Sequence, residues 1–149
     1  MTINEFEFQY TLGTTKEFEF QYALGTIDIE DLSDISEETT SKYILTILSN
    51  DKNYFIRYCV ANNPNTPVDI LTKLSNDEDW LVRCNAIDNP NTLKEVLIKA
   101  SKDKDYNVRM CVARNPSTPI DVLTYLTKDE NVYVKYNAKD TLLDKGIQV

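Results

Sequence analysis

The sequence contains no histidine, the side chain that most often serves as a general base or a metal ligand. Its three cysteines, Cys59, Cys84 and Cys111, are widely spaced and form no Cys-x-x-Cys pair. This pattern argues against a disulfide framework and against a zinc or iron–sulfur site. A Ser-His-Asp or Cys-His set and a phosphate-binding glycine loop are also missing. We therefore expect a non-enzymatic protein without a metal ion or a cofactor.

Glycine and long apolar stretches are scarce as well. Only three glycines occur in 149 residues, which argues against an all-β fold with many tight turns. No apolar run approaches the roughly 20 residues that a membrane-spanning helix requires. The N-terminal residues lack the basic and apolar regions of a signal peptide. These absences predict a cytoplasmic protein that makes no use of a membrane.

The net charge of −8 is concentrated at one end of the chain. Residues 1–40 hold ten acidic residues and one base, whereas residues 41–149 hold 14 acidic and 15 basic residues. The body of the protein is therefore nearly neutral, and it lacks the basic surface that is typical of nucleic-acid-binding proteins.

A repeat of 26 residues runs through this neutral body. Bases, aspartates, Asn-Pro pairs, leucines and an apolar column all recur at the same spacing, which indicates tandem structural repeats. The basic column is Arg57, Arg83, Arg109 and Lys135, the acidic column is Asp51, Asp77, Asp103 and Asp129, and the apolar column is Ile56, Val82, Val108 and Val134.

Each unit predicts two short helices. Apolar residues at helical spacing place the first helix at 53–62, with counterparts at 79–88, 105–114 and 131–140. An Asn-Pro pair ends it, and the second helix follows with Thr66 as its N-cap and Pro67 as its first residue. Thr92 and Glu95 predict a capping box at the equivalent place. Helices of about ten residues are marginal alone, so the units must stack.

The motif V-R-x-x-V-A-x-N-P-x-T-P-x-x-x-L-x-x-L, carried here by residues 56–74 and again by residues 108–126, resembles the variant leucine-rich repeat, which is similar in appearance to HEAT arrays. The resemblance covers about residues 40–140 and implies a right-handed superhelix of short helices, some of them 3₁₀. Some members of the family carry an N-terminal iron–sulfur cluster. No cysteine precedes Cys59, so we do not expect that cofactor. The predicted fold is an all-α, right-handed solenoid over residues 40–149, preceded by an acidic leader over residues 1–39.

The leader holds two near copies of one segment, EFEFQYTLGT at 5–14 and EFEFQYALGT at 17–26. Aromatic and polar residues alternate in both, which predicts strands joined by a turn at 13–16. The favoured interpretation is a β-hairpin whose aromatic face covers the first repeat. The alternatives are one ordered copy with a redundant mobile duplicate, or an exposed strand that pairs with a partner or with another copy of the chain. Residues 27–38 are acidic and predict a linker or a capping turn.

Two sets of repeated side chains are candidate sites. The basic column could bind phosphates, but each base could equally meet an acid of the acidic column, and we favour this structural ladder because both columns recur in every unit. The second set is a stripe of aromatic and soft side chains along the first helices, which favours a protein partner although packing between units would also explain it. The stripe consists of Tyr54, Tyr58, Trp80, Cys84, Tyr106, Met110, Tyr133 and Tyr136.

Three functions are compatible with these features. The favoured one is a scaffold that binds another protein through the aromatic stripe. The second is a nucleic-acid-binding module of the HEAT-like kind, which the charge balance does not support. The third is an inhibitor or immunity-type module that covers a basic surface with the acidic residues 1–39.

Overall fold

The computed structural model describes residues 22, 25 and 27–148, and these residues contain helices and no strand. The helices are α3 (Ile29–Glu38), α4 (Lys42–Leu48), α5 (Tyr54–Asn62), α6 (Val68–Leu74), α7 (Trp80–Asp88), α8 (Lys94–Ala100), α9 (Tyr106–Arg114), α10 (Ile120–Leu126) and α11 (Val132–Asp144). The predicted all-α repeat of helix pairs is thereby confirmed. The predicted β-hairpin falls on residues that lie outside the described part of the chain.

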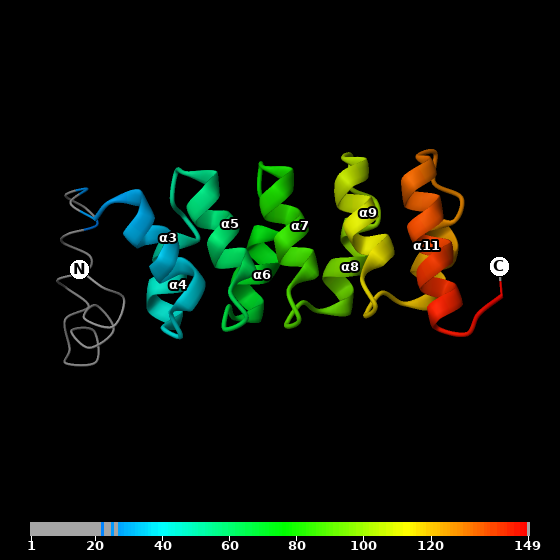
Figure 1. The fold of residues 1–149 in the computed structure, drawn as a ribbon, viewed down its shortest axis with the longest axis horizontal. Coiled ribbons are helices and arrows are strands. Elements are labelled where there is room, and N and C mark those ends of the chain that lie inside the picture. Colours follow the sequence, from blue (N-terminus) through cyan, green and yellow to red (C-terminus); the bar gives the residue numbers. More distant parts are fainter. Residues whose placement is uncertain (1–21, 23–24, 26, 149) are drawn as a thin grey trace.

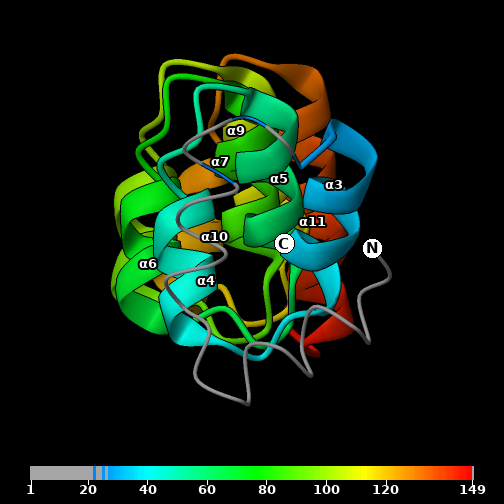
Figure 2. The ribbon, with the colours of Figure 1, turned by 90° about the vertical axis from the view of Figure 1, so that its left-hand side faces the viewer.

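The helices form two parallel rows that run the length of an elongated molecule (Figure 1). One row consists of α3, α5, α7, α9 and α11, each packed on the next, and the other of α4, α6, α8 and α10 (Figure 2). Figure 2 views the molecule from the N-terminal end. There the first-row helices lie on the right and run downward, and the second-row helices lie on the left and run back upward (Figures 1 and 2). The chain thus turns clockwise as it recedes, which is a right-handed superhelix.

The first-row helices of the repeats share one N-cap geometry. The residue before each helix is extended, and its side-chain oxygen accepts a hydrogen bond from the backbone N–H two residues later. These N-caps are Asn53, Asp79, Asp105 and Asn131. Because the same cap is used in every repeat, the first residue of each helix takes an equivalent position in the solenoid.

The second-row helices begin differently from the sequence prediction. Pro67, not Thr66, is the N-cap of α6, and no side chain caps the helix. The Thr66 hydroxyl instead donates to the carbonyl oxygen of Val60, at 2.5 Å, near the end of the preceding helix. Thr92 bonds the Ala86 carbonyl in the same way, so the predicted capping box is absent. Thr66 is buried and Thr92 is half-buried, and carbonyl oxygens near the end of the preceding helix are the acceptors within their reach.

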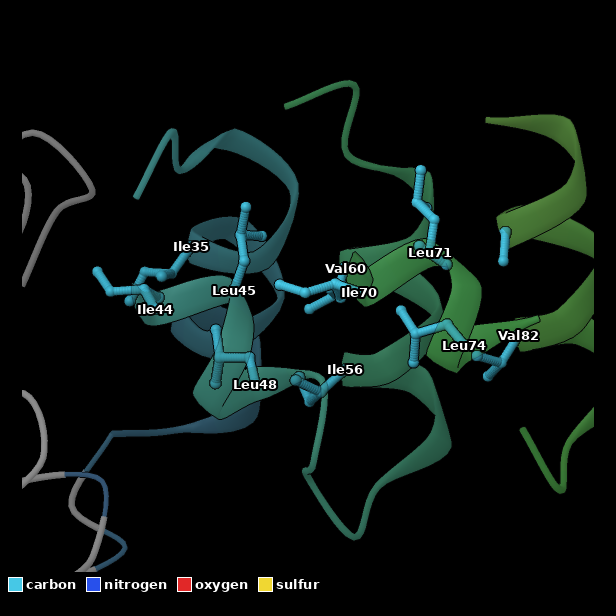
Figure 3. Close-up of a cluster of buried hydrophobic side chains, with 12 residues drawn as sticks. Ile35, Ile44, Leu45, Leu48, Ile56, Val60, Ile70, Leu71, Leu74 and Val82 are labelled. Atoms are coloured by element: carbon cyan, nitrogen blue, oxygen red, sulfur yellow. The ribbon is translucent and has the colours of Figure 1, made fainter. Parts of the chain in front are cut away.

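The core lies between the two rows, where each repeat contributes the same columns. Ile56, Val82, Val108 and Val134 are all buried in the successive layers. From the second row come Leu71, Leu97 and Leu123, and Leu74, Ala100 and Leu126. Figure 3 shows Leu71 and Leu74 in the N-terminal part of this core. Each repeat therefore completes its hydrophobic environment with its neighbours, as expected for helices too short to be stable alone.

Buried asparagines join successive repeats at the turns. The side-chain amide of Asn89 donates to the carbonyl oxygens of Ala61 and Asn63 in the preceding repeat, at 2.8 and 2.9 Å. Its side-chain oxygen accepts from the backbone N–H of Asn91, at 3.0 Å. Asn63 and Asn115 make equivalent bonds. The Asn-Pro pairs thus form both the local turn and the link to the previous repeat.

The N-terminal end of the described solenoid is covered by α3. The sequence predicts a linker or a capping turn over residues 27–38, but a ten-residue helix forms there and packs on α5. N-terminal to this helix lies Tyr22, whose hydroxyl donates a hydrogen bond to the Asp51 carboxylate at 2.5 Å. Burial, together with this hydrogen bond, raises the pKa of the Tyr22 phenol. The solenoid therefore begins N-terminal to residue 40.

Candidate partner-binding surface

A row of exposed side chains marks the ends at which the first-row helices begin. Tyr54, Trp80 and Tyr106 are the first residues of α5, α7 and α9, and they are 46%, 38% and 43% exposed. Val132 begins α11 and is also exposed, and Tyr133 follows it. Because each helix starts from the same cap, these residues lie along one edge of the solenoid. We call Tyr54, Trp80, Tyr106, Val132 and Tyr133 the aromatic row.

The other members of the predicted stripe lie one turn later on the same helices, and most of them are packed between repeats. Cys84 is buried at 5% exposure, so the expectation that it forms part of an exposed stripe is wrong. Tyr58 and Met110 are half-buried and pack against the core. Tyr136 alone, on the last helix, is exposed, at 67%. This column faces the next repeat along the solenoid, and α11 has no such repeat among the described residues.

Phe55 belongs beside the aromatic row, although the sequence did not single it out. It is exposed, and its ring stacks on that of Tyr58 with centroids 5.8 Å apart and an interplanar angle of 12°. The corresponding residues of the next two repeats are Leu81 and Asn107, so no repeated aromatic column draws attention to this position.

Alternating charges flank the aromatic row. Two residues before each of its helix-starting members stand Lys52, Glu78, Lys104 and Glu130, and all four are exposed. Charges of this kind contribute more to partner choice and orientation than to affinity. The surface is therefore aromatic along its length and changes the sign of its charge from one repeat to the next.

The predicted ladder consists of buried ion pairs between repeats. Arg57 bonds Asp77 at 2.7 Å, Arg83 bonds Asp103 at 2.8 Å, and Arg109 bonds Asp129 at 2.7 Å. Each arginine contacts both carboxylate oxygens of its aspartate. Lys135 occupies the same position in the last repeat, and it forms no ion pair with any residue that the structure describes.

Each arginine also binds its own turn. One guanidinium nitrogen of Arg83 donates to the carbonyl oxygens of Asp77 and Glu78, at 2.8 and 3.1 Å. The partner, Asp103, accepts in addition from the backbone N–H of Asp105. The group is thus a network that fixes two consecutive turns, and it leaves the guanidinium no free edge for a phosphate.

The charges in this ladder stabilise one another. Hydrogen bonds from Arg109 hold the pKa of Asp129 below its usual value, and they outweigh the opposing effect of burial. Burial alone would raise the pKa of Asp77, but the bonds from Arg57 lower it. The pKa values of both arginines are raised by the same contacts. Asp51, at the start of its column, receives the Tyr22 hydroxyl in place of an arginine side chain.

The three cysteines are free thiols in buried positions. Burial raises the pKa of Cys59 to about 11, and its sulfur lies 3.3 Å from the Ser33 hydroxyl on α3. Cys84 and Cys111 lie against each other across the junction of α7 and α9. The Cys84 thiol donates a hydrogen bond to the carbonyl oxygen of Asn107, at 3.5 Å. The interaction between the two cysteines raises the pKa of Cys84, which burial raises further, and lowers the pKa of Cys111.

The described residues hold no cluster of three or more Cys, Asp or Glu side chains that could bind a metal ion. Over the same part of the chain, every helix is too short or too polar to cross a membrane. Hollows do occur at the turns, such as one of about 500 Å³ lined by Asp88, Asn89, Arg114 and Asn115. The polar side chains that line this hollow form the ion pair between Asp88 and Arg114 and the asparagine hydrogen bonds already described.

No family model matches this chain, and no curated protein matches it either.

Proposed function

We propose that this protein is a non-enzymatic scaffold that binds another protein along the aromatic row. The observation that carries the proposal is the exposure of a large apolar side chain at the same helix-starting position in every repeat. Tyrosine and tryptophan are the residues most enriched among those that dominate binding energy. Short helices held by buried ladders present them rigidly, which lowers the entropic cost of binding.

The repeat spacing constrains the partner. Packed helices lie about 8–10 Å apart, so consecutive members of the row are separated by roughly that distance. A partner helix along the row would present one residue to each repeat about every five to seven positions, given a rise of about 1.5 Å per residue. An extended segment would do so about every third residue. The alternation of Lys52, Glu78, Lys104 and Glu130 favours a partner whose charges alternate over the same distance.

The test uses the triple variant Tyr54→Ala, Trp80→Ala, Tyr106→Ala as bait for proteins from a native extract of the source cells. The matched control changes three similarly exposed residues of the other helix row, Ile98→Ala, Ile120→Ala and Tyr125→Ala. We expect proteins that the wild type and the control retain to be lost by the aromatic-row variant. Circular dichroism should show the same helical content for all three proteins. Equal retention by the three baits would contradict the proposal.

A nucleic-acid-binding role has less support. The arginines that repeat most regularly, Arg57, Arg83 and Arg109, are buried in ion pairs and cannot reach a phosphate without leaving their aspartates. The net charge of −8 further disfavours approach to a polyanion. A gel shift with residues 27–149 at low salt tests this role, and a salt-sensitive complex would restore it.

The inhibitor alternative draws on the acidic residues of α3. Glu30, Asp34 and Glu37 are exposed, and the helix carries no base. Reversal of these three charges to lysine would abolish binding to a basic partner and leave a partner of the aromatic row unaffected.

We also propose, from the repeat motif and the features of the sequence, that the protein is cytoplasmic and related to the variant leucine-rich and HEAT-like repeats.

A further inference from the structure

The junction between α7 and α9 differs chemically from the equivalent junction at the N-terminal end. Cys84 and Cys111 belong to one buried cluster and are 5% and 3% exposed. The Cys84 sulfur lies 3.5 Å from the carbonyl oxygen of Asn107, which is one turn before Cys111 on the same face of α9. At the junction of α3 and α5, Cys59 instead meets a serine, Ser33.

The distance across the junction suits a covalent link. Packed helix axes lie about 8–10 Å apart and each Cα lies about 2.3 Å from its axis, so facing Cα atoms are roughly 3.4–5.4 Å apart, a range that overlaps the one a disulfide needs. A disulfide requires about 4.4–6.8 Å between Cα atoms. The Cys84 sulfur already lies 3.5 Å from a carbonyl oxygen one turn before Cys111, so the two cysteines can be joined without moving the helices apart.

We propose that Cys84 and Cys111 are a dithiol site that small disulfides, such as oxidised glutathione, convert to an intramolecular disulfide across the α7–α9 junction. The Cys111 thiolate attacks one sulfur of the oxidant, forming a mixed disulfide and releasing one thiolate. The Cys84 thiolate then attacks the Cys111 sulfur and releases the second. Two protein thiols are oxidised, and the oxidant is reduced to two small thiols that take up the two protons.

The surroundings assign the roles of the two sulfurs. Arg114 follows Cys111 by one turn of α9, and its positive charge favours the thiolate form of both cysteines, but the carboxylate of Asp88, its ion-pair partner, opposes this with a larger effect. The interaction with Cys84 lowers the pKa of Cys111, so Cys111 is the more acidic thiol and the attacking group. Cys59 has a raised pKa and a serine as its neighbour, so it lacks a resolving thiol.

The disulfide would fix the relative orientation of α7 and α9 in the middle of the solenoid. It joins the second and third repeats, whose relative orientation sets the curvature of the aromatic row between Trp80 and Tyr106. A cross-link between residues 84 and 111 restricts the unfolded chain, and we expect it to raise the melting temperature by roughly 5–10 °C.

The test uses the full chain with Cys59→Ser, which leaves only the proposed pair. After incubation with oxidised glutathione, intact mass spectrometry should show a monomer that has lost two hydrogen atoms. Tryptic digestion without reductant should give residues 84–94 linked to residues 110–114. Melting should move upward on oxidation and return on reduction.

Three outcomes would overturn the proposal. These are retention of both thiols under native conditions, disulfides between chains, and a melting temperature that oxidation leaves unchanged or lowers. Cys59→Ser, Cys84→Ser is the matched control, because a Ser–Cys contact is accommodated at the α3–α5 junction and the fold should persist. Its melting temperature should not respond to the oxidant, and a response equal to that of Cys59→Ser would also refute the assignment.

Discussion

The arginine–aspartate ladder and the aromatic row recur with the same period but occupy opposite environments. The ladder keeps nearly the same residues in each repeat and is buried, whereas the row varies from tyrosine to tryptophan to valine and is exposed. Variation alone does not identify a surface, however. The column of Tyr58, Cys84 and Met110 varies just as much, yet it packs between repeats. A repeated column tolerates variation wherever its contacts differ from one junction to the next.

The largest effect should follow from breaking the ladder. Arg83→Ala leaves the largely buried carboxylate of Asp103 without its charge partner and frees the carbonyl groups of the turn, so we expect a loss of about 3–5 kcal/mol in the free energy of unfolding. Urea unfolding followed by circular dichroism measures it. The double variant Arg83→Met, Asp103→Leu removes both charges and should lose less than Arg83→Ala does. A loss below about 1 kcal/mol for Arg83→Ala would contradict the structural role of the ladder.

A smaller loss should follow from removing one inter-repeat amide. Asn89→Ala leaves the carbonyl oxygens of Ala61 and Asn63 without this donor in a buried turn, and we expect a loss of about 1–3 kcal/mol. Asn85 is the control, because its side chain bonds only the Leu81 carbonyl within α7. Asn85→Ala should cost about 0.5 kcal/mol or less in the same urea assay. Equal losses would show that the asparagine link between repeats adds nothing.

Acid should destabilise the protein by protonating the aspartates of the ladder. The folded-state pKa of Asp129 lies below its unfolded value of about 3.8, so between the two values the unfolded chain binds more protons. The stabilisation is present above about pH 4 and is lost as the pH falls through the folded-state pKa. The urea midpoint should therefore drop between about pH 5 and pH 2, and it should drop less in Asp129→Asn. An identical pH dependence in that variant would count against the prediction.

The smallest effect on stability is expected in the aromatic row. Tyr106→Ala removes a side chain that is already 43% exposed, and we expect a change within about 0.5 kcal/mol. Met110→Ala, four residues later on the same helix, empties part of a junction and should cost about 1 kcal/mol or more. Thermal or urea unfolding of the two variants compares them directly. If Tyr106→Ala is the more damaging, the row is a packing element and not a free surface.

Much of the architecture could be predicted from spacing. Apolar residues at helical intervals located α5, α7 and α9 to within one residue at each end, and Ile56, Val82, Val108 and Val134 line up as the repeat requires. The bases and aspartates were correctly matched as structural columns, although their burial was not foreseen. Propensity rules failed at Thr66 and Thr92, because hydroxyls that favour N-caps in general were used to satisfy a neighbouring helix end.

The sequence by itself determined the period, the helix pairs and the columns that share an environment, because every repeat copies the same local pattern. It could not decide which columns face solvent and which face the next repeat. That choice depends on the angle at which the helices stack, and it placed Tyr54 in the open, Cys84 against Cys111, and the arginines inside the turns. The contacts between repeats join residues twenty or more positions apart, so only the tertiary structure brings their chemistry together.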